Sequence, residues 1–413
     1  MWFSLLLLAI LGVVLPALAQ TLPLQTESRW ILDATGARVK LRCINWAGHL
    51  ETNIPEGLHV QTIDYIADFI QAQGFNCVRL TYSIDYALNP TISVQDSFTA
   101  AANASGLPLE TLDGLYSQVV ATNPFVADAT VQDVRSAVIA ALWDRQVMTI
   151  LDNHVSKASW CCSLDDGNGW WDTAPIFVAE NSQYFNTTEW LEGLTAIATW
   201  AQSQTGVVAM SIRNELRPFP LLQDTDNHDA WYEYVTQGAQ AVNVANPDVL
   251  IIIGGSQSAE DLSFIKSRPL DITWTGKHVF EMHAYSFSVS YVNPLNICSV
   301  ALAEYGLLDG FVLTQNEAYT APLILSEFGV GLSGGPNDGI SDADLSYFNC
   351  IMQYMEGNDM EWALWALQGS YYIRQGVADV KETWGLIDYD WVGLRNEQFL
   401  PMMANLFLVT QGP

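Results

Sequence analysis

The chain has few basic residues: 16 Lys and Arg stand against 45 Asp and Glu among 413 residues, which gives a formal net charge of −29. Proteins that bind nucleic acid neutralise its phosphates with cationic side chains. The composition therefore excludes nucleic acid as a partner and disfavours anionic membranes and polyanionic substrates. A soluble protein with a neutral ligand fits this charge, although solubility alone explains it equally well.

Long apolar runs are missing after the first residues. The N-terminal run is short, contains Pro16 near its end, and closes on Ala17-Leu18-Ala19, the small-residue pattern of a signal-peptidase site. We expect residues 1–19 to be a secretory signal peptide rather than a membrane anchor, and the mature chain to be extracellular. No later segment is long and apolar enough to span a bilayer, so we expect no membrane partner.

The sequence also lacks a Pro/Ser-rich linker and an internal repeat. Its length exceeds the usual size of a single core, but barrels with insertions reach it. We therefore predict one domain over residues 20–413, and we expect it to act as a monomer.

The six cysteines include no C-x-x-C pair, so the pattern predicts no zinc site. In a secreted chain an even number of cysteines favours disulfides, whose pairing the sequence leaves open. We expect the adjacent Cys161 and Cys162 to bond to different partners, with a bridge between them as the alternative. Two sequons, at Asn103 and Asn186, are candidate glycan sites.

Short apolar or β-branched runs alternate with helical patterns along the chain. The expected barrel strands are residues 42–46, 76–81, 148–152, 207–212, 249–253, 278–283, 323–326 and 362–367. Most are nearly continuous apolar runs, as is typical of parallel strands buried on both faces. Apolar stripes at helical spacing lie between them, for example at residues 63–70, 131–142 and 191–201.

Roughly eight strand–helix units predict an α/β fold, a (β/α)₈ TIM barrel with long βα loops. Before the first barrel strand, residues 30–33 and 39–41 flank Ala34-Thr35-Gly36, which indicates an N-terminal β-hairpin that closes the barrel floor.

Polar residues gather where the expected strands end. Arg79, His154, Asn214-Glu215, His283, Tyr285, Glu327 and Trp365 all follow or end such a strand. Barrel enzymes work at the carboxyl ends of their strands, so this repetition predicts an active site there.

Glu215 and Glu327 each follow a short apolar run, where an unpaired charge has no packing role. Hydrolysis of a glycosidic bond needs an acid to protonate the leaving oxygen and a second carboxylate. When that carboxylate attacks directly, the two carboxyl groups lie about 5–5.5 Å apart and configuration is retained. We predict Glu215 as the acid/base and Glu327 as the nucleophile; the alternative is two surface glutamates in salt bridges.

Three neighbours have candidate supporting roles. Asn214 is positioned to bond a sugar 2-hydroxyl, although an isolated Asn is often a turn residue. Arg79 is expected to keep Glu327 ionised through a charge-assisted bond, the alternative being a structural ion pair. Tyr285 is expected to hydrogen-bond Glu327, unless it is a buried tyrosine with a backbone partner.

The histidines do not indicate a metal site. His278 and His283 are an odd number of positions apart, so they lie on opposite faces of one strand and cannot chelate together. We expect His154 and His283 to line the sugar site and orient the carboxylates, and we expect neither a metal nor another cofactor. The alternative for each is a structural histidine.

Aromatic residues make up 11% of the chain, with 15 Trp. Trp365 is the best candidate for stacking on a sugar ring. Packing in the core is at least as good an interpretation for the weaker candidates, Trp46, Trp160, Trp170, Trp171 and Trp384.

At these residues the chain resembles glycoside hydrolase family 5, the cellulase family of retaining (β/α)₈ enzymes. The family's Arg, His, Asn-Glu, His-x-Tyr, Glu and Trp are matched by Arg79, His154, Asn214-Glu215, His283-Ala284-Tyr285, Glu327 and Trp365, with Trp362 as a second fit for the last. The segments 153–169 and 365–372 are similar to a plant and fungal subgroup.

The resemblance implies a secreted retaining β-glycoside hydrolase that acts by double displacement on a neutral β-linked polysaccharide or oligosaccharide. We expect an endo-β-1,4-glucanase. A β-mannanase, a β-1,3-glucanase and another β-glycosidase of the family are the alternatives within the class. The alternative outside it is a non-catalytic barrel that binds sugar, which would keep the aromatics and lose a glutamate or Arg79.

Overall fold

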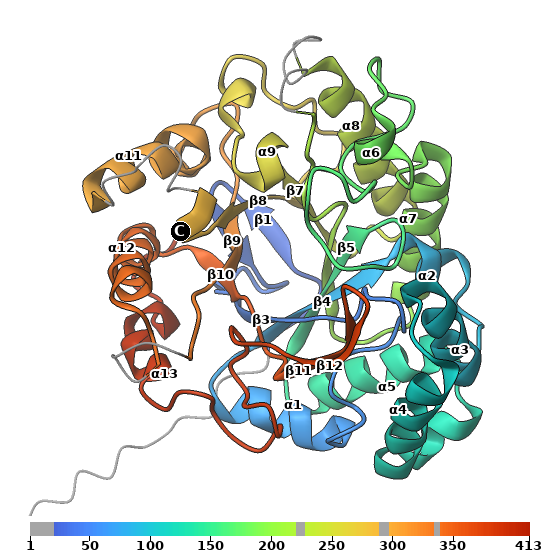
Figure 1. Cartoon of the computed structure of the whole chain (residues 1–413). Helices are drawn as coiled ribbons and strands as arrows, with labels where there is room; N and C mark the ends of the chain where they lie inside the picture. Colours follow the sequence, from blue (N-terminus) through green and yellow to red (C-terminus); the bar gives the residue numbers. More distant parts are fainter. Residues whose placement is uncertain (1–19, 220–227, 289–296, 334–338) are drawn as a thin grey trace, which may run out of the picture.

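The computed structural model describes residues 20–219, 228–288, 297–333 and 339–413. Eight parallel strands close into a barrel in the order β10-β3-β4-β5-β6-β7-β8-β9 and lie at the centre of a ring of helices (Figure 1). The predicted (β/α)₈ barrel is thus confirmed. The barrel strands are β3 (Arg42–Trp46), β4 (Cys77–Ser83), β5 (Met148–Val155), β6 (Val207–Ser211), β7 (Leu250–Gly254), β8 (His278–Ala284), β9 (Leu323–Phe328) and β10 (Glu361–Leu364).

The helices cover the outside of the barrel, and those expected from helical spacing are present. Several of them begin with a side-chain cap: Thr130 accepts from the backbone N–H of Asp133 at the start of α5, and Asp133 accepts from that of Thr130. The helices are α1 (Ile63–Ala72), α2 (Ile84–Leu88), α3 (Val94–Ser105), α4 (Leu109–Thr122), α5 (Val131–Asp144), α6 (Ala179–Ser182), α7 (Thr187–Ala201), α8 (Asp229–Ala245), α9 (Ser256–Ala259), α11 (Cys298–Leu308), α12 (Asp342–Asn358) and α13 (Phe399–Met402).

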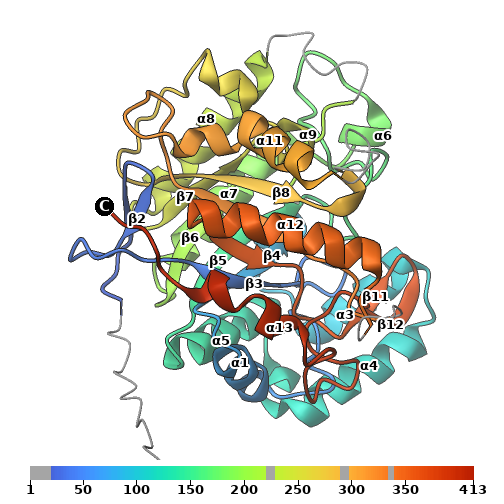
Figure 2. The same ribbon diagram turned by 90° about the vertical axis from the view of Figure 1, so that its left-hand side faces the viewer.

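The predicted N-terminal hairpin is present across residues 34–36: Leu32 forms an antiparallel bridge with Arg38, and the Val39 N–H donates to the Ile31 carbonyl. The sequence did not indicate that β2 (Trp30–Leu32) also pairs with β1 (Gln25–Glu27), which precedes it. Figure 2 shows β2 and the C-terminus at one end of the barrel. A second hairpin, β11 (Ser370–Arg374) with β12 (Val377–Lys381), lies at the other end.

The barrel interior changes character from floor to mouth. Side chains of a strand alternate between two faces, so positions two apart point into the barrel together. On β5, Met148 and Ile150 belong to an apolar cluster with Ile31 of the hairpin, and Asp152 and His154 continue the same face. The floor is therefore apolar, and the polar residues lie at the carboxyl ends of the strands.

All six cysteines are bonded. Cys43–Cys77 joins β3 to β4 inside the barrel, and Cys298–Cys350 joins α11 to α12. The third bridge joins the neighbours Cys161 and Cys162, so the expectation that they bond to different partners is wrong. Sequence separation gave no guide to this pair, because pairing depends on where the loop folds.

The remaining expectations concern surface features and ends. Asn103 is exposed on α3, whereas Asn186 is half-buried and caps α7 through a bond from the backbone N–H of Glu189. The predicted signal peptide, residues 1–19, lies outside the described residues. Among the described residues, no helix is both long enough and apolar enough to cross a membrane.

Candidate active site

Strand geometry brings the predicted residues together at the barrel mouth. Arg79 lies two positions beyond Cys77, and His283 lies four beyond Val279, so both extend an inward-facing series. Glu327 follows a different course. The β8–β9 ladder pairs Met282 with Leu325 and then His283 with Glu327, which leaves Ser326 as an extra residue. This bulge turns Glu327 into the interior beside His283.

Arg79 is the hub of the buried polar cluster. Its Nη1 donates to Glu327 Oε1 at 2.8 Å, and its Nη2 donates to Asp152 Oδ1 at 2.9 Å and to Asn214 Oδ1 at 2.7 Å. Glu281 Oε2 lies 3.6 Å from Arg79 Nη2. Burial alone would lower the pKa of Arg79, but the charges of these carboxylates raise it. The guanidinium therefore stays charged.

Glu327 accepts two fixed hydrogen bonds. Arg79 holds one carboxylate oxygen, and the Tyr285 hydroxyl donates to the other at 2.9 Å. His154 is farther away, with Nδ1 4.0 Å from Glu327, and its Nδ1 lies 2.6 Å from Asp152. Both predicted contacts to Glu327, from Arg79 and from Tyr285, are present in the structure.

Glu215 sits across from Glu327 and is less buried, with 13% of its side chain exposed. His283 Nδ1 lies 3.1 Å from Glu215 Oε1 and 3.8 Å from Glu327 Oε2. Arg217 Nη1 lies 3.4 Å from Glu215 Oε2. One carboxylate oxygen of Glu215 and one of Glu327 lie within 4.8 Å of each other. This separation is short enough for one carboxylate to attack an anomeric carbon while the other protonates the oxygen that leaves it.

His283 holds a proton between the two carboxylates. Burial would lower its pKa, but the charge of Glu327 and the hydrogen bond to Glu215 outweigh burial and raise the pKa to about 9. For Glu327, burial raises the pKa above its usual value, with Glu215 adding to the effect and His283 and Arg79 opposing it. Burial acts on Glu215 in the same direction, yet the bond to His283 and the charges of His283 and Arg217 lower its pKa.

A cavity of about 560 Å³ opens above these groups. Glu215, Glu327, Asn214, His154, Tyr285 and Trp365 all line it. Trp365 lies nearly parallel to the His154 ring, with ring centroids 5.6 Å apart. Its neighbour Trp362 is fully buried among phenylalanines instead, so of the two tryptophans that fit the family pattern, Trp365 is the one at the site.

The other candidate platforms divide between the cavity and the core. Trp160 and Trp384 line the cavity, and the Arg374 guanidinium lies 3.7 Å over the Trp160 ring. Trp46 and Trp171 are fully buried, so of the two interpretations core packing is the one that holds for them.

Several residues of the site were not predicted from the sequence. Arg217 and its partner Asp166 meet across two loops, and Glu281 is hidden within an apolar strand. Glu260 also lines the cavity; burial raises its pKa to about 8, and the charge of Glu215 adds to this. The inward period of β8 offers a signal for Glu281, whereas the loop residues offer none.

Among the described residues, two groups bring possible metal ligands within 4.8 Å: His154 with Cys161 and Cys162, and Glu215 with His283 and Glu327. The two sulfurs are joined in a disulfide and offer no thiolate. A protonated His283 has no free ring nitrogen for a metal. Neither group therefore has the donor set of a metal centre in this state.

Sequence comparison identifies relatives. The profile described as Cellulase (glycosyl hydrolase family 5) matches residues 32–370. The "Glycosyl hydrolase 5 family protein" of Chamaecyparis obtusa is 39% identical and covers 99% of this chain and 70% of its own length. The "Endoglucanase" of Paenibacillus polymyxa is 21% identical and covers 89% of this chain and 82% of its own length.

Solved structures share the fold. The catalytic domain of the major endoglucanase from Xanthomonas campestris pv. campestris superposes with a TM-score of 0.70 at 19% identity, covering 93% of this chain and 99% of that one. The hyperthermophilic endocellulase of Pyrococcus horikoshii superposes with a TM-score of 0.71 at 16% identity. The match covers 94% of this chain and 100% of that one. With the barrel, the profile match and the plant relative, the predicted resemblance is confirmed: the chain belongs to glycosyl hydrolase family 5.

Proposed function

We propose that this chain is a secreted, retaining endo-β-1,4-glucanase in which Glu327 is the nucleophile and Glu215 the acid/base. The observation that carries the proposal is the pair of carboxylates, with oxygens within 4.8 Å of each other, at the base of a cavity. A direct attack by one carboxylate needs this short separation, because a wider gap would hold a water between them.

In the first step a Glu327 oxygen bonds to the anomeric carbon while the bond to the leaving oxygen breaks and Glu215 gives that oxygen a proton. In the second step Glu215 takes a proton from water, the water oxygen bonds to the anomeric carbon, and the ester to Glu327 breaks. We assign the hydrogen bond to the sugar 2-hydroxyl to Asn214, whose Oδ1 accepts from Arg79.

The pKa directions run against this division of roles, since the pKa of Glu327 is raised and that of Glu215 is lowered, whereas the acid/base must begin protonated. The hydrogen bonds favour the roles as proposed. Both Glu327 oxygens accept from donors, Arg79 and Tyr285, which an ionised carboxylate satisfies best.

Support for β-1,4-glucan comes from relatives. The Paenibacillus relative is named an endoglucanase, and a complex of the Pyrococcus endocellulase holds cellotetraose. Support for secretion comes from the short N-terminal apolar run and from the three disulfides, which persist in oxidising compartments.

A substrate panel tests this proposal. The purified protein should release reducing ends from carboxymethylcellulose and mixed-linkage β-glucan and lower their viscosity quickly, because endo action cuts inside the chain. Preferred hydrolysis of mannan or laminarin would move the activity to β-mannanase or β-1,3-glucanase. Binding to β-glycans without hydrolysis of any of them would show that the chain is a non-catalytic barrel that binds sugar.

The variant Glu327→Gln separates catalysis from binding. It keeps the shape of the side chain and removes the nucleophile, so kcat should fall by at least about 10³-fold while the protein stays folded. Glu397→Gln, near the C-terminus and outside the cavity, is the matched control and should keep wild-type turnover. Near wild-type kcat in Glu327→Gln would remove Glu327 from the proposed role.

A further inference from the structure

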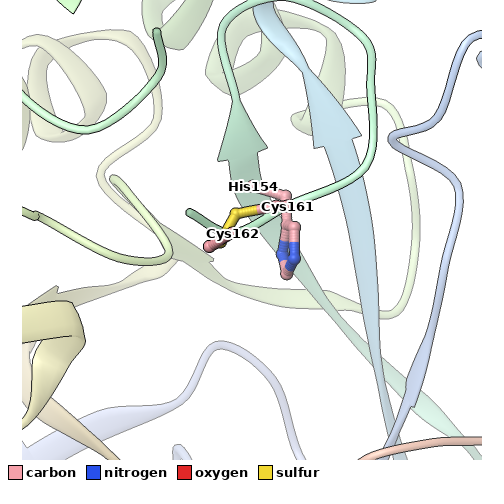
Figure 3. A group of neighbouring side chains, drawn as sticks. All are labelled: His154, Cys161 and Cys162. Carbon is pink, nitrogen blue, oxygen red and sulfur yellow. A yellow bond between two sulfur atoms is a disulfide. The ribbon is translucent and has the colours of Figure 1, made fainter. Parts of the chain in front are cut away.

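The Cys161–Cys162 disulfide lies in the wall of the catalytic cavity. Both residues line the cavity with Glu215, and Figure 3 shows the bridge beside His154, in the loop that follows β5. The proposed hydrolysis gives this bridge no redox or ligand role. The contacts of the two sulfurs indicate which side chains the bridge holds in position.

The first contact is with Asn214. Its Nδ2 lies 3.6 Å from Cys162 Sγ and 4.0 Å from Cys161 Sγ, while its Oδ1 accepts from Arg79. A side-chain amide has one oxygen and two N–H donors. With the oxygen fixed by Arg79 and one N–H facing the sulfurs, the amide has a single orientation in the cavity wall.

The second contact reaches Glu215 through Arg217. Arg217 Nη1 donates to Cys161 Sγ at 3.6 Å and lies 3.4 Å from Glu215 Oε2. The same guanidinium also bonds to two residues of the loop after β5. Its Nη2 lies 2.8 Å from both carboxylate oxygens of Asp166, and its Nε donates to the carbonyl of Ser163. The disulfide thus contacts the same guanidinium that lies against Glu215 and that bonds to Ser163 and Asp166 of the loop.

We propose that the Cys161–Cys162 disulfide is a positioning element for the acid/base half of the site: it orients the Asn214 amide and holds Arg217 against Glu215. The inference rests on the proposed roles of Glu215 and Asn214. Because Arg217 is one of the charges that lower the pKa of Glu215, loosening Arg217 should raise that pKa.

The test compares Cys161→Ala/Cys162→Ala with the wild type and with Cys298→Ala/Cys350→Ala, which removes the bridge between α11 and α12. The cavity variant should lose on the order of 10-fold or more in kcat with KM nearly unchanged, since the Asn214 contact strengthens in the transition state. In the cavity variant, the alkaline limb of the kcat–pH profile should move to higher pH. The outer variant should unfold at lower temperature but keep both the kcat and the pH profile.

A double-mutant cycle shows whether the bridge acts through Arg217. Arg217→Met should also move the alkaline limb to higher pH, and adding the cysteine pair to it should move the limb no further. Equal and additive shifts would show that the disulfide does not act through Arg217 and would overturn that part of the proposal.

A titration that needs no turnover keeps this inference separate from the proposed function. The carboxyl ¹³C resonance of Glu215, assigned with Glu215→Gln, is followed against pH in the wild type and the cavity variant. A higher pKa in the variant supports the positioning role even if no glycan is hydrolysed, and superimposed curves overturn it. Cys161→Ser/Cys162→Ser replaces the alanine pair if the latter does not fold.

Discussion

Arg79 makes the acidic barrel mouth possible, because it pairs with three buried carboxylates at once. Asp152, Glu281 and Glu327 lie 2.9, 3.6 and 2.8 Å from its guanidinium nitrogens. An uncompensated buried charge costs several kcal/mol. Arg79 therefore supports both the fold of the mouth and the ionised form of Glu327.

Arg79→Lys should damage catalysis despite keeping the charge. A Lys ammonium is a compact charge that cannot bond Asp152, Asn214 and Glu327 together. We expect kcat/KM to fall by at least about 10²-fold, as for a misplaced catalytic group. Because Arg79 opposes the rise in the pKa of Glu327, the acidic limb of kcat/KM should move to higher pH.

Arg145→Lys is the control for this change. Arg145 also pairs with two carboxylates, Asp64 and Asp68, but on the outside of the barrel. Its variant should keep the wild-type pH profile. An unchanged profile in Arg79→Lys as well would show that Arg79 does not set the ionisation of Glu327, the proposed nucleophile.

At the residue scale, the sequence indicated the groups that end strands but not those held by loops. Glu215 and Glu327 stand out because each follows an apolar run, and period two places Arg79 and His283 inside the barrel. The Ser326 bulge, which turns Glu327 inward, has no signature in an apolar run. Arg217 and Asp166 meet through the folding of two loops, which local patterns do not encode.

At the scale of elements, the loop after β3 docks against the C-terminal segment through a glycine. Gly57 has φ of +90°, and a Cβ built on it would lie 2.3 Å from the buried Trp391 ring. Both the backbone conformation and the space require glycine here. The contact ties the first βα loop to the last segment of the chain.

Gly57→Ala should therefore lower the free energy of unfolding by at least about 2 kcal/mol, through strain and displacement of Trp391. Gly114→Ala is the matched control, because Gly114 lies exposed within α4 with open space at its Cβ position. That change should add up to about 1 kcal/mol through helix propensity. Urea unfolding measures both, and equal effects of the two substitutions would contradict the account.

The barrel strands were predictable as elements because buried parallel strands read as apolar runs. The N-terminal hairpin was predictable only in part. Gly36, with φ of +85°, marks the turn across residues 34–36 that the structure contains, but the additional strand that pairs with β2 was not predicted. The strand that pairs with β2, Gln25–Glu27, is short and largely exposed, so it lacks the hydrophobic alternation that reveals a strand.

At the scale of the whole molecule, stability should increase toward mildly acid pH. With a net charge of −29, the many carboxylates repel one another at neutral pH, and this repulsion destabilises the folded chain. Burial raises the pKa of Glu56 and of Asp309 well above the usual range. Such a carboxyl is protonated in the folded chain at pH values where the unfolded chain has lost the proton, so folding gains stability as pH falls through the folded pKa.

Glu56→Gln tests one part of this trend. The amide keeps the bond from the backbone N–H of Tyr372 and needs no proton. Wild type should gain stability from pH 8 to pH 5 by up to about 1.4 kcal/mol per pH unit for this one group, and the variant should lack that share. Glu27→Gln, on the exposed β1, should keep the wild-type slope. Equal slopes in all three proteins by urea unfolding would contradict the assignment.

The stereochemistry of the first product tests the central claim most directly. The wild-type protein is mixed with cellopentaose, and ¹H NMR follows the anomeric protons before mutarotation. Direct attack by Glu327, with Glu215 across the cavity as the acid, predicts that the β-anomer forms first. An α-anomer formed first would mean that water attacks directly, and it would contradict the paired roles of Glu215 and Glu327.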